Sequence, residues 1–125
     1  MLISSEYLEL NRRLHSDPNY GTSGRKYAQR VLWLTESRDI LDYGCGKRTL
    51  ETWLGFEIKN YDPVTNPERP SPSEVVVCTD VLEHIEEGCL EAVLDDLRRV
   101  VSGFGYFTIA TGPAKKVLPD GRNAH

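Results

Sequence analysis

The sequence has no apolar run approaching the roughly 20 residues that a membrane-spanning helix needs. Its first residues also lack the basic start and apolar stretch of a signal peptide. The three cysteines, Cys45, Cys78 and Cys89, are too few and too widely spaced for a disulfide framework or a zinc site. These absences predict a soluble protein of the reducing cytoplasm, with no metal centre.

Positive charge is also scarce. The chain has 15 Lys and Arg against 19 Asp and Glu, a net charge of −4, and its basic residues are scattered. Nucleic-acid binding needs a basic patch, so no nucleic-acid partner is predicted. With 125 residues, 39% of them hydrophobic, the chain is predicted to form one globular domain.

Short apolar runs alternate with helical patterns, and there is no hairpin signal. This order predicts an α/β fold with a Rossmann-like, mostly parallel sheet of about four strands flanked by helices. The predicted strands cover residues 39–42, 56–61, 75–79 and 106–110. A helical cap over 1–36, a core over 37–111 and a tail over 112–125 make up the predicted domain.

Apolar spacing predicts the helices, which cover residues 3–14, 23–34, 49–54 and 90–101. The second is predicted to bury Leu34, and the last to expose an acidic face that includes Asp96. Prolines make residues 65–73 a loop. The glycines of residues 103–105 predict a turn before the last strand.

Three aspartates each end an apolar run: Asp42, Asp62 and Asp80. In an open parallel sheet, ligands bind beyond the carboxyl ends of the strands, where the strand order reverses. Neighbouring strands would therefore bring these carboxylates into one crevice. Such a crevice suits a ligand that carries hydroxyls and positive charge.

Three kinds of nucleotide ligand could use the glycine turn at residues 44–46. A phosphate-binding P-loop would need Gly at Leu41 and Ser or Thr at Arg48, so that interpretation fails. A dinucleotide fingerprint would need Gly at Thr49 and would place pyrophosphate beside Asp42, a repulsion that Lys47 and Arg48 could offset. That alternative stays open.

The third ligand, S-adenosylmethionine, has net positive charge and no phosphate. Asp62 follows Asp42 by about 20 residues. In nucleotide-binding α/β folds, an acidic residue at this spacing accepts hydrogen bonds from the ribose hydroxyls.

Residues 40–46 (ILDYGCG), 61–63 (YDP) and 77–85 (VCTDVLEHI) resemble the class I S-adenosylmethionine-dependent methyltransferase family. The resemblance spans about residues 38–110, more than half of the chain. It implies methyl transfer from S-adenosylmethionine to an acceptor, with S-adenosylhomocysteine as product. It also implies ribose binding by Asp62. The cofactor-binding residues that it implies are Asp42, Tyr43, Gly44, Cys45, Gly46, Tyr61, Asp62, Pro63, Cys78, Thr79 and Asp80.

The sequence departs from the family pattern in three places. Arg48 stands where the family usually has glycine, the loop over 63–73 replaces a helix and a strand, and the family's final β-hairpin is missing. The last strand is therefore expected to leave an open edge, to be covered by a second chain or by the tail, unless the chain is a truncated one. Truncation is the favoured explanation.

No catalytic residue follows from these patterns. His84 is expected to pack near the site rather than act as a base, and Lys26 is a candidate for the cofactor's carboxylate. Cys45 is not expected to be a nucleophile, because no histidine is placed nearby in sequence to activate it. The acceptor is expected to be a small molecule. The alternative function is a non-catalytic module that binds the cofactor or a protein partner.

Overall fold

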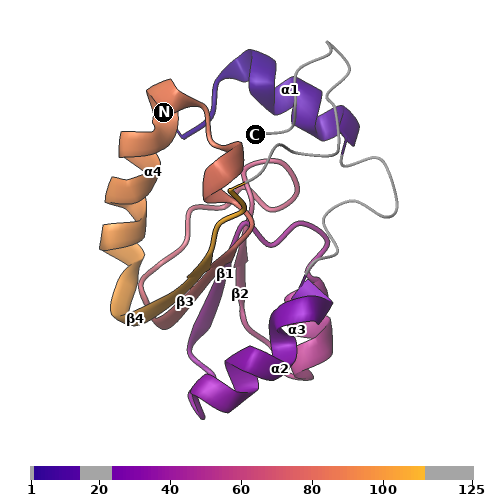
Figure 1. Ribbon diagram of the computed structural model, residues 1–125, viewed down its shortest axis with the longest axis vertical. Coiled ribbons are helices and arrows are strands. Elements are labelled where there is room, and N and C mark those ends of the chain that lie inside the picture. Colours follow the sequence, from indigo (N-terminus) through magenta and orange to yellow (C-terminus); the bar gives the residue numbers. More distant parts are fainter. Residues whose placement is uncertain (1, 15–23, 112–125) are drawn as a thin grey trace.

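The computed structural model describes residues 2–14 and 24–111 of the chain (Figure 1). It is an α/β fold in which a four-stranded, all-parallel sheet in the order β2-β1-β3-β4 is flanked by helices. The predicted Rossmann-like fold is confirmed. The predicted tail over 112–125 lies outside the described residues.

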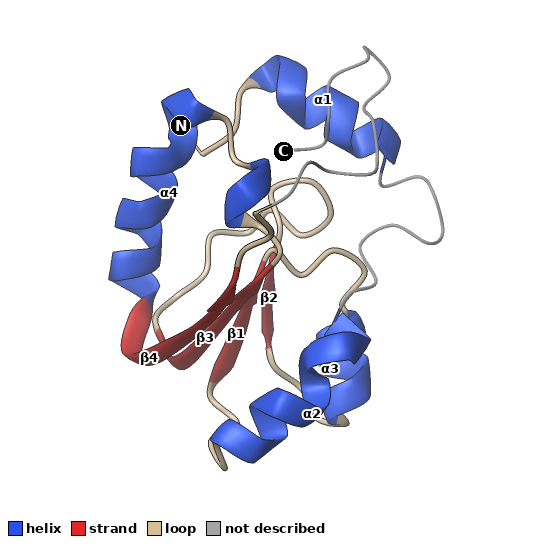
Figure 2. Ribbon diagram, in the orientation of Figure 1, coloured by secondary structure: helices blue, strands red, loops and turns tan. Residues whose placement is uncertain are grey.

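The elements are coloured by type in Figure 2. The strands are β1 (Ile40–Tyr43), β2 (Lys59–Tyr61), β3 (Ser73–Thr79) and β4 (Val101–Thr108). The helices are α1 (Ser5–Leu14), α2 (Gly24–Leu34), α3 (Thr49–Leu54), α4 (Glu87–Val100) and the 3-10 turn η1 (Leu82–His84).

Two apolar clusters hold the layers together. On one face, Val31 of α2 and Leu50 of α3 pack against Ile40 of β1 and the odd-numbered valines of β3. On the other face, α4 packs its apolar stripe against the alternate side chains of the same strands. Residues 75–79 of β3 are buried on both faces, as their unbroken β-branched and apolar run predicts.

Helix α1 lies beyond the carboxyl ends of the strands (Figure 1). The segment before it is held by Glu86, which accepts hydrogen bonds from the Ser4 backbone N–H (2.9 Å) and hydroxyl (2.8 Å). None of the described helices is long and apolar enough to cross a membrane.

The predicted turn at residues 103–105 is wrong, because β4 begins at Val101 and runs through both glycines. A Cβ on Gly103 would lie 2.4 Å from the carbonyl oxygen of Glu74, so the glycine permits a close approach of β3. The strand register shifts between Ser73 and Val75, as in a β-bulge. Glycine here serves strand packing rather than a turn.

Two smaller predictions also need correction. Strand β2 begins at Lys59 rather than at residue 56, because the N–H of Ile58 donates to the Glu51 carboxylate (2.8 Å) and not to a strand. Leu34, which was predicted to be buried, is exposed. The buried residues of α2 are Tyr27, Ala28 and Val31.

Strand β4 forms one edge of the sheet, as predicted, and no described strand pairs with its outer side. Phe104 and Phe107 are exposed on it, and Ile109 is exposed just after its end.

Candidate functional site

The candidate site lies at the carboxyl ends of β1, β2 and β3. From β1 the chain passes first to β2 on one side and later to β3 on the other, so the strand order reverses between β1 and β3. Asp42 stands level with Asn60 of β2 and Val77 of β3. This reversal is where open α/β sheets bind ligands.

Asp42 is a buried carboxylate among other acidic groups. Its side chain shares the α2 and α3 face with Ile40, two residues earlier. Burial, together with the smaller effects of the negative charges of Asp62 and Glu51, raises the pKa of Asp42 to about 7. Within residues 2–14 and 24–111, no hydrogen-bond donor or cation is paired with it. A cation placed beside Asp42 would therefore favour its ionised form.

Asp62 is also buried, but its oxygens already hold the chain together. Its Oδ1 accepts the N–H groups of Val64 (2.8 Å) and Thr65 (3.2 Å), and its Oδ2 accepts the N–H of Gly46 (3.1 Å). A carboxylate offers about four lone-pair sites. About one is left for a ligand hydroxyl.

The glycine turn after β1 uses its own backbone donors. The N–H groups of Gly44 (2.7 Å) and Cys45 (2.9 Å) both donate to the carbonyl oxygen of Tyr61, and that of Gly46 donates to Asp62. Gly44 has φ +92°, and a Cβ there would lie 2.3 Å from a methyl carbon of Val81. The turn brings the loops after β1 and β3 into contact. With these three N–H groups engaged, it is poorly suited to cradle a phosphate.

Asp80 joins three elements at the same end of the sheet. Its Oδ2 accepts the Tyr27 hydroxyl of α2 (2.8 Å) and its Oδ1 accepts the Thr108 hydroxyl of β4 (3.1 Å). The backbone of Asp80 has φ +55°, outside the usual range for a non-glycine residue. Lys26 is exposed nearby, and its pKa is raised by Tyr27 and then by Asp80.

The structure divides the other predicted site residues between the two faces. Tyr43, Tyr61 and Cys78 belong to the cluster on the α4 face, away from Asp42. Thr79 is buried and Pro63 is half-buried. Burial raises the pKa of the Cys45 thiol to about 12, so it stays protonated at neutral pH. No group of three or more His, Cys, Asp or Glu is placed to hold a metal ion in the described part of the chain.

Sequence reasoning was wrong about Asp96, which is buried rather than part of a solvated acidic face. Its Oδ2 accepts the Tyr43 hydroxyl (2.7 Å), and its Oδ1 accepts Nε (3.1 Å) and Nη2 (3.0 Å) of Arg99. Arg69 reaches the same oxygen (3.4 Å). The sequence contained a signal for this burial. If the helical periodicity of α4 is counted from Cys89 rather than from Leu90, its buried stripe includes position 96.

Comparisons of the chain with protein-family models, with curated proteins and with solved structures found no match.

Proposed function

We propose that the chain is an S-adenosylmethionine-dependent methyltransferase domain that acts on a small-molecule acceptor. The observation that carries the proposal is Asp42, a buried carboxylate with its pKa raised to about 7 at the strand-order reversal. A ligand that brings a sulfonium and an ammonium group to this edge would stabilise the ionised carboxylate, and the carboxylate would stabilise the ligand.

A phosphate-bearing cofactor fits the same edge less well. Two like charges about 4 Å apart repel by roughly 4 kcal/mol at an effective dielectric near 20. The N–H groups of Gly44, Cys45 and Gly46, which would have to offset that repulsion, already bond to Tyr61 and Asp62. This favours S-adenosylmethionine over the dinucleotide alternative.

In this proposal, each residue at the carboxyl ends of the strands has a different role in binding the cofactor. Asp42 faces the positive groups of the cofactor, Asp62 accepts one ribose hydroxyl, and Gly44 keeps the turn close to Val81. When bound, S-adenosylmethionine supplies a methyl group on a positively charged sulfur. The protein's part is mainly to hold and orient the two reactants, worth up to roughly 7–11 kcal/mol in favourable cases.

The experiment is a calorimetric titration of the intact chain with S-adenosylhomocysteine, followed by an assay for its production from S-adenosylmethionine over a panel of small acceptors. We expect one binding site, weakened in Asp42→Asn and unchanged in Asp95→Asn, whose carboxylate is exposed and paired with Arg98. A folded chain that binds no S-adenosylhomocysteine would refute the proposal.

A non-catalytic module that binds the same cofactor is the second candidate. It is favoured by two departures from the family pattern: Arg48 stands where the family usually has glycine, and a loop without a helix or strand connects β2 to β3. Binding without turnover across the acceptor panel would favour this alternative over the enzyme.

A further inference from the structure

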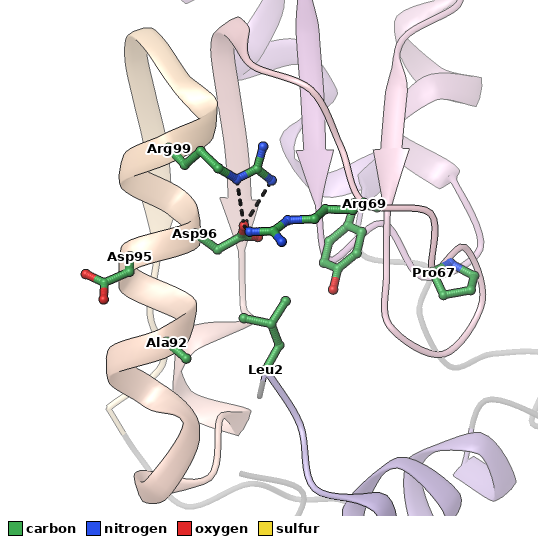
Figure 3. Close-up of a pocket in the computed structure, with 8 residues that line it drawn as sticks. Leu2, Pro67, Arg69, Ala92, Asp95, Asp96 and Arg99 are labelled. Carbon is green, nitrogen blue, oxygen red and sulfur yellow. Dashed lines mark hydrogen bonds and ion pairs between the residues drawn. The ribbon is translucent and has the colours of Figure 1, made fainter.

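A cavity lies on the opposite side of the sheet from Asp42. It has a volume of about 590 Å³, within the range of small-molecule sites. Ala92, Asp96 and Arg99 of α4 form one wall, and Pro67 and Arg69 of the loop form the other (Figure 3). Leu2 and Tyr61 complete it. Because Tyr61 belongs to the apolar cluster under α4, the cavity lies on the other face of the sheet from the Asp42 side chain.

The cavity exists because the connection from β2 to β3 contains no helix. Residues 62–72 cross this face as a loop, held to α4 by a hydrogen bond from Arg99 to the Pro70 carbonyl oxygen (2.9 Å). A packed helix would fill the space beside α4. The loop instead leaves the ring of Tyr61 on the cavity wall. The centroid of this ring lies 4.9 Å from that of the Tyr43 ring.

The charges in this cavity do not cancel. Arg69 and Arg99 share a single buried carboxylate, Asp96, whose side chain is 2% exposed. Asp95 also lines the cavity, but it is paired with Arg98 at 2.6 Å. Two guanidinium groups that share one carboxylate leave an excess of one positive charge.

The positive excess persists at neutral pH. Burial of Asp96 favours its neutral form, but hydrogen bonds from Tyr43 and Arg99 outweigh this and lower its pKa. Asp96 therefore stays ionised and holds both guanidinium groups at the cavity.

Both arginines keep unused donors. A guanidinium carries five N–H groups. Among the described residues, Nη1 of Arg99 and both Nε and Nη1 of Arg69 donate to no acceptor. Arg69 is 72% exposed on its loop, so it can turn toward a bound anion without unpacking the core.

We propose that this cavity binds a small molecule made of an apolar ring and one oxyanionic group. The oxyanion contacts the free N–H groups of Arg69 and Arg99, and the ring packs against Tyr61, Leu2 and Ala92. This site goes beyond the proposed methyltransferase activity. Its ligand has the opposite charge to the one expected at Asp42, and it approaches the other face of the sheet.

The test uses two fluorescent probes with the same aromatic body, anilinonaphthalene sulfonate and the neutral phenylnaphthylamine. We expect saturable one-to-one binding of the sulfonate to the intact chain. Arg69→Met should weaken it by about tenfold or more, as expected for a lost charge-assisted hydrogen bond. The neutral probe should bind more weakly than the sulfonate and be indifferent to that change.

Arg12→Met is the matched control, because Arg12 is also an exposed arginine in an ion pair, but its partner is Glu9 of α1 and neither residue lines the cavity. It should bind the sulfonate as the unchanged chain does. Ala92→Leu, which fills the cavity without altering its charge, should weaken both probes. Circular dichroism confirms that each variant is folded. Equal sulfonate binding by Arg69→Met and Arg12→Met, or no saturable binding by the unchanged chain, would overturn the proposal.

Discussion

Asp96 shows how one buried carboxylate can organise its surroundings. It accepts hydrogen bonds from a strand residue, Tyr43, from Arg99 of its own helix and from Arg69 of the crossing loop. Buried charges are tolerated when they are paired and hydrogen-bonded, and removing one partner is costly. Its hydrogen bond with Tyr43 therefore contributes to stability.

Tyr43→Phe tests that contribution. The variant loses a 2.7 Å hydrogen bond to a charged acceptor, so we expect the free energy of unfolding to fall by about 1.5–3 kcal/mol in urea titrations. Tyr106→Phe is the control, since no described residue is hydrogen-bonded to the Tyr106 hydroxyl, and it should change stability by less than about 0.5 kcal/mol. Equal losses in the two variants would contradict the assigned role of Asp96.

Asp62→Ala tests the ribose contact. Loss of one charge-assisted hydrogen bond should weaken S-adenosylhomocysteine binding by about 1–3 kcal/mol, measured by calorimetry. Unfolding free energy should also fall, because the N–H groups of Gly46, Val64 and Thr65 lose their acceptor. An unchanged affinity in the folded variant would eliminate Asp62 as a ribose ligand.

At the scale of elements, Gly103 of β4 and Gly88 of α4 differ in the space available for a side chain. Gly103 lies where β3 approaches closely, and a Cβ there would meet the Glu74 carbonyl oxygen at 2.4 Å. At Gly88, near the start of α4, nothing lies within 4 Å of an added Cβ. The same substitution should therefore have opposite effects at these two positions.

Gly103→Ala should lower the free energy of unfolding by about 1–3 kcal/mol, because the backbone of β3 must move. Gly88→Ala should raise it by about 0.4–1 kcal/mol, since the unfolded chain loses freedom and the helix gains a better helix former. Chemical denaturation of both variants measures the difference. A stabilising Gly103→Ala would show that β3 and β4 are not so closely packed.

The pKa of Asp42 depends on the whole molecule, because three parts of the fold contribute to its shift. Burial comes from the sheet, and the additional negative charges come from Asp62 after β2 and Glu51 in α3. The folded protein keeps the Asp42 proton up to a pH of about 7, whereas the unfolded chain releases it near 3.8. Stability from this group is present at low pH and is lost as the pH rises through about 7.

Asp42→Asn should remove that loss. The unfolding free energy of the variant minus that of the unchanged chain should rise by at most roughly 4 kcal/mol between about pH 4 and pH 7. Above about pH 7 this difference should stay constant. Urea titrations across this range measure it, and groups other than Asp42 cancel in the comparison. A difference that does not vary with pH would contradict the raised pKa.

The same ionisation should control ligand binding. S-adenosylhomocysteine carries an ammonium group, so its affinity for the unchanged chain should increase as the pH rises through about 7 and Asp42 ionises. In Asp42→Asn the affinity should be lower and show no such increase. Calorimetry at several pH values distinguishes the two. Parallel pH profiles would place the ammonium group away from Asp42.

Much of this protein followed from local patterns. The unbroken run at Val75, Val76 and Val77 predicted a strand buried on both faces, and the alternation of strands and helices predicted a parallel sheet. Helix α3 begins and ends where the sequence predicted a short helix, at Thr49 and Leu54. Because parallel strands end at one edge, the positions of Asp42 and Asp62 in the sequence were enough to place both at that edge.

Tertiary structure alone decided which polar groups are free to act. Asp62 and Asp42 look alike in the sequence, yet three backbone N–H groups engage the first and no described donor engages the second. Likewise, Asp95 and Asp96 are neighbours, but only Asp96 faces the core. Apolar spacing is a property of neighbouring residues and can be read from the chain. Hydrogen-bond partners and cavities depend on segments that meet only in the folded protein.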